Sequence, residues 1–143
     1  MKTDEIYLQP GHLIRRAHQT ATAIFMSEAK AFDLTPVQFA ALIVIRDTPG
    51  IEASKVADLV YFDRSTIGNV LERLERKGLI VRQPGVHDRR TKALFLTPEG
   101  KVVTRKITAK SPAISQRILE PLTEAERRTF LDMLRRLAPN GSD

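Results

Sequence analysis

Apolar residues recur along most of this chain at intervals of three and four, which is the spacing of an amphipathic α-helix. The first such segment runs from residue 12 to about residue 32. Thr35-Pro36-Val37-Gln38 is a capping box with proline at the first helical position. It predicts a second helix, apolar on nearly all sides and therefore buried, that ends near Asp47. A short helix over residues 53–60 is expected to follow.

Asp63 is a suitable N-cap for a longer helix over residues 64–77, and Gly78 stands where a C′ glycine ends such a helix. The period then changes to that of two strands, residues 79–83 and 92–96, joined by a polar turn. The apolar positions of the longer helix share one side, at i, i+3, i+4 and i+7. They are Ile67, Val70, Leu71 and Leu74.

Two more helices complete the pattern. Thr97-Pro98 begins a long one, with a disturbance expected at Pro112. Thr123-Glu124-Ala125-Glu126 is a capping box for a last helix that reaches about residue 138. Only Asn140–Asp143 has the composition of a loose tail.

This order of elements is mainly helical with one two-stranded wing. A short helix, a three-residue turn and a longer helix form a helix-turn-helix, and the hairpin that follows makes the unit a winged helix. The 143 residues are the length of one domain. We therefore expect a single domain over residues 1–143, with a winged helix-turn-helix lobe at about 53–97. The outer helices lie at about 5–32 and 112–138.

Composition narrows the functional classes. The chain has no cysteine and only three dispersed histidines, and it lacks a glycine-rich phosphate loop, a G-x-S-x-G motif and a paired-carboxylate motif. We therefore expect no enzyme, no metal site and no cofactor. No apolar segment approaches the roughly 20 residues that span a bilayer, and no signal peptide is visible. A cytoplasmic protein without membrane contact is expected.

The net charge of +6 is concentrated in the predicted winged helix. Residues 64–92 contain eight Lys or Arg and three Asp or Glu, so five of the six excess charges lie there. This distribution favours a polyanionic partner, and double-stranded DNA is the partner that suits the fold.

The side of the 64–77 helix opposite its apolar residues carries short polar groups and a cation. Asn pairs with adenine and Arg with guanine in the major groove, each worth about 1–3 kcal/mol of discrimination, while arginines also suit phosphates. An arginine at the hairpin tip suits a narrow minor groove, and Asp88 is placed to orient it. The alternative is an ordinary solvated face and turn. The candidate DNA-binding residues are Arg64, Ser65, Thr66, Asn69, Arg73, Asp88, Arg89 and Arg90.

The segment VADLVYFDRSTIGNVLERLERKGLIVRQPGVHDRRTKALFLTPEG resembles the winged helix-turn-helix core of the MarR family of bacterial transcription regulators. The resemblance lies in D-R-S-T at the helix start, L-x-R-L-x-x-K-G-L at its end, D-R-R in the turn and L-T-P-E-G after the last strand. It implies that Ser65, Thr66 and Asn69 lie on the recognition helix. The D-x-R pattern of the wing falls on Asp88 and Arg90.

One departure from the family is Gly68-Asn69, which stands where the family often has Thr-Arg, so the operator sequence is not carried over. A glycine inside a helix costs about 1 kcal/mol relative to alanine. Close packing or close approach to DNA would explain it.

The outer helices carry more apolar residues than a small winged helix covers. Packing within the chain is one explanation. Members of the MarR family are homodimers built from their N- and C-terminal helices, so the resemblance implies a homodimer that reads half-sites about one helical turn apart. The residues of this stripe are Ile114, Ile118, Leu119, Leu122, Phe130, Leu134 and Leu137.

The first helix is rich in cations beside its apolar face. Arg16 lies on one margin of that face, His18 on the other and Arg15 further round. A cation at the edge of an apolar pocket suits a small aromatic carboxylate. The segment GHLIRRAHQ is similar to MarR-type regulators of aromatic-acid catabolism. The resemblance implies an effector bound between the first helix, the second helix and the DNA-binding lobe, and we expect at least one of Arg15, Arg16 and His18 to contact it. The alternative is that they are solvated or pair with acids across the dimer.

Together these features predict a sequence-specific DNA-binding transcriptional regulator. The resemblance of the first helix to aromatic-acid-responsive regulators further predicts that the protein is a repressor. A small aromatic acid or its CoA thioester would release it from a pseudo-palindromic operator. One rival is a winged-helix interaction module whose basic face binds an acidic protein, and another is a MarR-type regulator without an aromatic effector. The polar face formed by Ser65, Thr66 and Asn69 favours DNA over an acidic protein.

Overall fold

The computed structural model describes residues 1–139, and the predicted tail Asn140–Asp143 lies outside the described residues. The prediction of a mainly helical chain with one two-stranded antiparallel hairpin is confirmed. In chain order the elements are α1 (Thr3–Ile6), α2 (Pro10–Glu28), the 3₁₀ turn η1 (Lys30–Phe32), α3 (Pro36–Asp47), α4 (Ala53–Leu59), α5 (Arg64–Arg76), β1 (Ile80–Pro84), β2 (Lys92–Leu96), α6 (Pro98–Leu119) and α7 (Glu124–Leu137).

Three details differ from the sequence pattern. The short α1 was not expected, and α2 ends at Glu28 rather than near residue 32. The chain leaves α2 through η1 and then turns at Asp33, whose φ of 50° lies in the left-handed region. Pro112 lies inside α6, which continues through it to Leu119.

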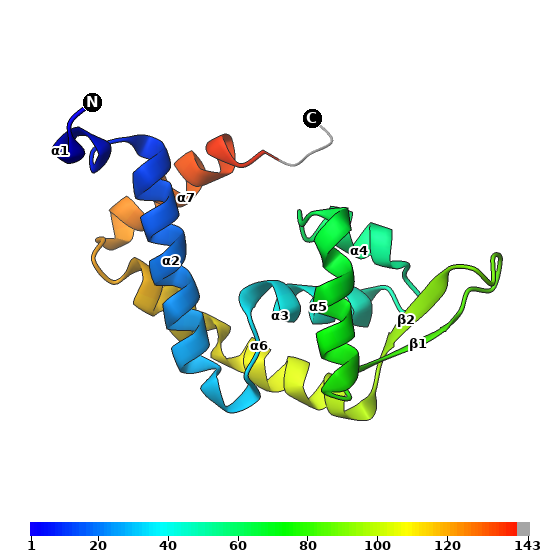
Figure 1. The fold of residues 1–143 in the computed structure, drawn as a ribbon. Helices are drawn as coiled ribbons and strands as arrows, with labels where there is room; N and C mark the ends of the chain where they lie inside the picture. The colour runs from blue at the N-terminus through cyan, green and yellow to red at the C-terminus, as the bar shows by residue number, and fades with distance from the viewer. Residues whose placement is uncertain (140–143) are drawn as a thin grey trace.

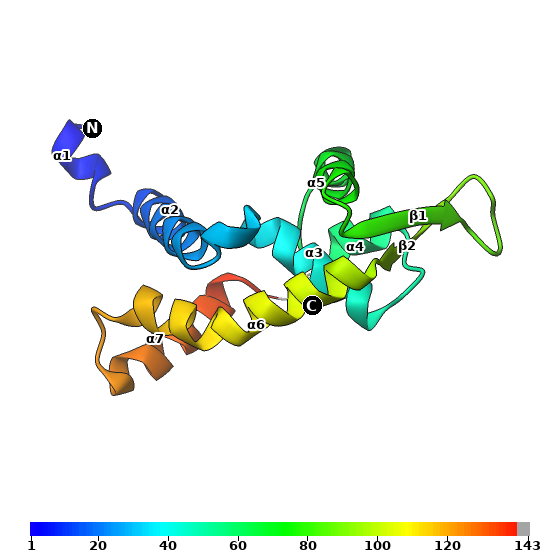
Figure 2. The same ribbon diagram turned by 90° about the horizontal axis from the view of Figure 1, so that it is seen from below.

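Figure 1 shows α1, α2 and α7 on one side of the molecule and α4, α5 and the hairpin on the other, with α6 running between them. The tip of the hairpin and α1 lie at opposite ends in the second view (Figure 2). Because α6 packs against α2, α3 and β2, one helix connects the two sides. No helix described over residues 1–139 is long and apolar enough to cross a membrane.

The hydrophobic core lies chiefly in the winged-helix half. The buried side of α3 packs into this core. The capping box of α3 is formed as predicted, with Thr35 N donating to Gln38 Oε1 (2.9 Å) and Gln38 N donating to Thr35 Oγ1 (3.2 Å). By contrast, α1 and α7 contain no buried residue. The largest fully buried side chains are Leu34, Leu42, Ile45, Leu71, Leu74, Ile80, Leu94, Ile107, Val56 and Thr104.

The end of α5, the base of the hairpin and the start of α6 are joined at Thr97. Its backbone N donates to Leu79 O (3.0 Å), its hydroxyl donates to Gly78 O (2.6 Å), and the same hydroxyl accepts from Gly100 N (3.0 Å). Gly78 has a φ of 73°, which ends α5 as predicted. A Cβ atom at Gly100 would overlap the carbonyl of Leu79, so this approach of α6 requires glycine.

We therefore expect Gly100→Ala to lower the free energy of unfolding by about 1–3 kcal/mol or more, because backbone atoms have to move apart. Thermal or urea unfolding of the whole chain measures the change. Gly11→Ala in α2, where a Cβ atom meets nothing within 4 Å, is the matched control. Equal stability of the two variants would contradict this account of the junction.

Candidate nucleic-acid interface

The helix-turn-helix consists of α4, a turn and α5. Phe62 N donates to Ala57 O (2.9 Å), and Tyr61 turns the chain with a φ of 55°. Asp63 caps α5 as predicted by accepting from Ser65 N (2.9 Å), and this hydrogen bond holds the pKa of the Asp63 carboxyl below its ordinary value. The start of α5 is therefore held by its own N-terminal residues.

The apolar and polar sides of α5 are the ones that the sequence predicts. Its apolar positions are buried, and Ser65, Thr66, Asn69 and Arg73 are exposed. Among the described residues, no hydrogen bond or ion pair engages the side chain of Asn69 or Arg73. Thr66, Asn69 and Arg73 also line a shallow cavity of about 240 Å³ that Thr35 at the start of α3 borders. Three of the four candidates therefore lie along the flank of α5 that faces α3.

Arg64 takes a structural contact that the sequence analysis did not find. Its Nε and Nη2 atoms donate to the two carboxylate oxygens of Asp58 in α4, at 3.0 and 2.6 Å. The guanidinium holds the pKa of Asp58 below its ordinary value, and both side chains are exposed. Opposite charges six residues apart across a tight turn were the available signal. Arg64 therefore links the two helices.

Several other cations in the basic segment are also paired with acids. Arg76 Nη2 lies 2.6 Å from Glu72 Oε1 and Lys77 Nζ lies 3.2 Å from Asp33 Oδ2. Arg82, in β1, lies 3.4 Å from a carboxylate oxygen of α5. The positive charge predicted for this segment is thus partly neutralised locally. Within residues 1–139 the cations of the segment that have no ion pair are Arg73, Arg89 and Lys92.

The wing is an antiparallel pair in which Ile80 lies opposite Leu96 and Pro84 opposite Lys92. Asp88 organises its turn, since its Oδ1 accepts from Arg90 N (3.0 Å) and its carbonyl accepts from Thr91 Oγ1 (2.7 Å). The Arg90 guanidinium is 95% exposed, with Nε 3.8 Å from Asp88 Oδ1. Asp88 therefore acts mainly on the backbone that presents Arg90, and only weakly on its guanidinium.

Gly68 lies on the exposed part of α5. A Cβ atom at this position meets nothing within 4 Å, so close packing inside the chain does not explain the glycine. Close approach to DNA, the other reason that the sequence suggested, stays a prediction.

The cations of α2 lie far along the chain from this surface and are exposed. Arg15 Nη2 is 3.3 Å from His12 Nδ1, while the structure brings neither Arg16 nor His18 to a partner among the described residues. The cavities of about 440 and 410 Å³ are lined by other residues. Within residues 1–139, no group of three potential ligands is arranged to hold a metal ion.

Comparison with known proteins gives consistent matches. A model of the MarR family matches residues 34–92. The chain is 32% identical to the HTH-type transcriptional repressor NicR of Pseudomonas putida, over 90% of this chain and 82% of that protein.

Two solved structures show the same likeness over nearly the whole chain. The PcaV transcriptional regulator from Streptomyces coelicolor is 35% identical, with 91% of this chain and 95% of that one covered and a TM-score of 0.80. Bordetella bronchiseptica BpsR, in a structure concerned with the regulation of its DNA binding by 6-hydroxynicotinic acid, is 31% identical. That match covers 93% of this chain and 95% of BpsR with a TM-score of 0.84.

Gly68→Ala separates stability from binding. We expect the variant to unfold at a higher temperature, by the equivalent of about 1 kcal/mol, because alanine is the better helix former and the added methyl group meets nothing. We expect weaker binding to duplex DNA, because the methyl group occupies space on the exposed face. Thermal unfolding and fluorescence anisotropy with labelled DNA measure the two effects.

The matched control is Gly78→Ala, whose φ of 73° makes alanine unfavourable, so it should lose stability instead. An unchanged DNA affinity in Gly68→Ala would show that this part of α5 stays clear of the DNA.

Proposed function

This chain belongs to the MarR family of DNA-binding transcriptional regulators, which are not enzymes, and from that membership we propose that it is a sequence-specific repressor released from its operator by a small aromatic acid or the CoA thioester of one. The observation that carries the DNA-binding part is the exposed polar face of α5 beside an arginine-tipped wing. On that face the side chains of Asn69 and Arg73 have no hydrogen bond or ion pair among the described residues. We assign residues 53–97 to the DNA-binding lobe.

Six of the eight candidate residues have a role that follows from their contacts or their exposure. Asn69 and Arg73 are free to meet base edges in the major groove, and Ser65 lies at the helix N-terminus, where phosphates are favoured. Arg64 is already bonded through Nε and Nη2, so its remaining donors suit a phosphate. The arginines of the wing tip suit a narrow minor groove.

We further propose that the chain is a homodimer formed through its N- and C-terminal helices. The support is the apolar surface that the single chain leaves uncovered at that end. Leu13 is 47% exposed and Ile14 52% exposed in α2, and Leu137 is 70% exposed in α7. Ile114, by contrast, is buried within the chain, so the predicted stripe is divided between the core and this surface. A two-fold dimer reads a pseudo-palindromic operator.

The effector site that we propose comprises Arg15, Arg16 and His18 on α2. Their exposure in the single chain and the uncovered apolar residues beside them support a pocket completed by a second subunit. The relationship of BpsR to 6-hydroxynicotinic acid and the repressor name of NicR support an aromatic acid and a repressor, respectively. The alternatives are an effector of another class, and an acidic protein as the partner of the basic face.

Arg90→Ala tests the wing. We expect it to weaken binding to operator and random DNA alike and to reduce the slope of log K against log salt by about one unit, because one phosphate-region cation is lost. Anisotropy titrations at several salt concentrations measure the slope. Asn69→Ala should instead reduce the preference for operator over random DNA.

The matched control for both variants is Lys30→Ala, an exposed cation in η1 outside the proposed interface. An Arg90→Ala variant with unchanged affinity and slope would remove the wing from the mechanism. A weak dependence of wild-type binding on salt, with tight binding to an acidic protein, would favour the interaction module.

The effector is tested by thermal unfolding against a panel of aromatic carboxylates and their CoA thioesters. A ligand at 100 times its dissociation constant stabilises the protein by about 2.7 kcal/mol, a shift of several degrees. We expect at least one of three variants to abolish the shift, namely Arg15→Ala, Arg16→Ala and His18→Ala. Lys106→Ala on α6 should keep it. No shift anywhere in the panel would leave a MarR-type regulator without an aromatic effector.

A further inference from the structure

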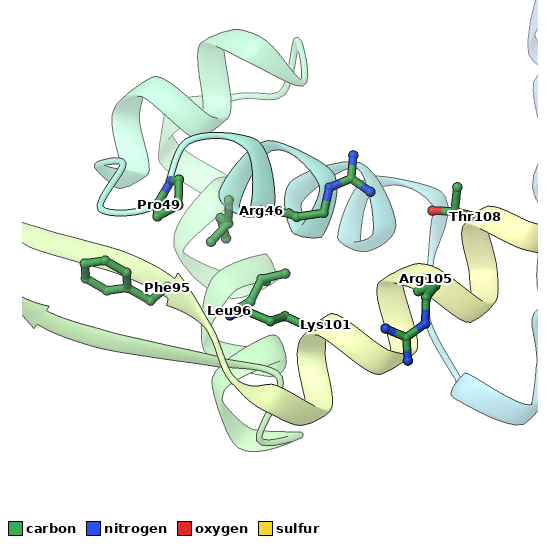
Figure 3. Close-up of a pocket in the computed structure, with 8 residues that line it drawn as sticks. Arg46, Pro49, Phe95, Leu96, Lys101, Arg105 and Thr108 are labelled. Carbon is green, nitrogen blue, oxygen red and sulfur yellow. The ribbon is translucent and has the colours of Figure 1, made fainter.

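A cavity of about 440 Å³ lies between α3, the turn that follows it, β2 and the first half of α6. Figure 3 shows its labelled side chains, which come from these segments, and none comes from α2 or α5. It therefore involves neither the proposed base-reading face nor the α2 cations. Its volume is in the range of small-molecule sites, about 300–1,000 Å³.

Part of the wall is apolar. Phe95 and Leu96 from β2 line it, with Pro49 from the turn. The buried side chain of Ile45, from α3, also belongs to this wall. The Phe95 ring approaches Gly50, where a Cβ atom would lie 3.5 Å from its Cζ. Phe95 and Leu96 are both half-buried, so they offer apolar surface against which a planar ring can pack.

Three cationic side chains line the cavity. Arg46 contributes from α3, and Lys101 and Arg105 contribute from α6 (Figure 3). The Arg46 guanidinium is neutralised by Asp47, with Nε 2.8 Å from Oδ1. Lys101 and Arg105 have no ion pair or side-chain hydrogen bond among the described residues, so two positive charges remain uncompensated.

These two cations stand four residues apart on α6, an arrangement that destabilises a helix by repulsion when nothing lies between them. A bound anion removes the repulsion and adds charge-assisted hydrogen bonds. Two charges call for a dianion, whereas a monocarboxylate would leave one cation uncompensated.

We propose that this cavity binds a small organic dianion on a flat apolar body, such as an aryl phosphate or an aryl dicarboxylate. The dianionic group lies between Lys101 and Arg105, and the ring lies against Phe95 and Leu96. The site goes beyond the proposed function, because it shares no residue with the DNA-binding face or with the effector site on α2.

The test measures binding to the full-length chain by isothermal titration calorimetry. The probes are phenyl phosphate, phthalate, benzoate and inorganic phosphate. We expect phenyl phosphate and phthalate to bind at least tenfold more tightly than benzoate and inorganic phosphate. A comparison of the first two distinguishes a phosphate ligand from a dicarboxylate ligand, and either preference supports the dianion site.

The variant is Lys101→Gln combined with Arg105→Gln, which should lose at least tenfold in affinity for both aryl dianions. Its folding is checked by thermal unfolding, and both side chains are exposed, so the fold is expected to be kept. Lys106→Gln, an exposed cation on α6 that does not line the cavity, is the matched control and should bind as the wild type does.

Each of three further results, besides the absence of aryl-dianion binding in the wild type, would overturn the proposal. Wild-type affinity in the double variant removes the cations from the site. Equal affinity for inorganic phosphate and phenyl phosphate removes the apolar wall. A loss of DNA affinity without any loss of probe binding assigns the cations to DNA.

Arg16→Ala keeps this experiment separate from the effector hypothesis. The variant should retain phenyl phosphate binding while it loses binding of the aromatic effector identified in the thermal-unfolding panel. If Arg16→Ala still binds both the aromatic effector and phenyl phosphate, only the effector site on α2 is contradicted. If the wild type binds no aryl dianion, only the dianion site between α3, β2 and α6 is contradicted.

Discussion

The contact between Thr97 and the end of α5 determines where the functional surfaces of this protein lie. One threonine bonds the backbone of Gly78 and Leu79 and caps α6, and Gly100 allows α6 to pass against the Leu79 carbonyl. The recognition helix, the wing and the long connecting helix thus meet at a single point. Their relative orientation is held by one backbone hydrogen bond and by two hydrogen bonds of the Thr97 hydroxyl, so α5 and the wing are joined at the start of α6.

The charge on that surface has two uses. Arg64, Lys77 and Arg82 are engaged with acids from other segments, and Arg76 with Glu72 of its own helix. Arg73 and Arg89 have no ion pair among the described residues, and Arg90 has only a 3.8 Å approach to Asp88. Exposed ion pairs contribute little stability each, so the structural pairs chiefly orient helices. The unpaired cations are the ones from which a DNA contact is expected, because no ion pair has to be broken when they bind.

The molecule is also divided into a well-buried half and an under-packed half. The winged helix has a complete core, while α7 and the first part of α2 leave apolar side chains in solvent. The proposed second copy of the chain would cover that surface and complete the proposed effector site. The cavity between α3, β2 and α6 needs no second copy, because a single chain supplies both its apolar wall and its cations.

The sequence by itself determined most of the elements of this protein and the exposed face of α5, but not the short α1 or the end of α2 at Glu28. The signals that worked are local, because they act between residues within about one or two helical turns. They are the capping boxes, the left-handed Gly78 and the spacing of Ile67, Val70 and Leu71, and each can be recognised in the sequence without knowledge of the fold. Only the tertiary structure decided which cations are free. Lys77 and Asp33 are 44 residues apart in the chain, and packing alone brings them together. For the same reason the cavity behind Phe95 was invisible in the sequence, because its walls come from three separate elements.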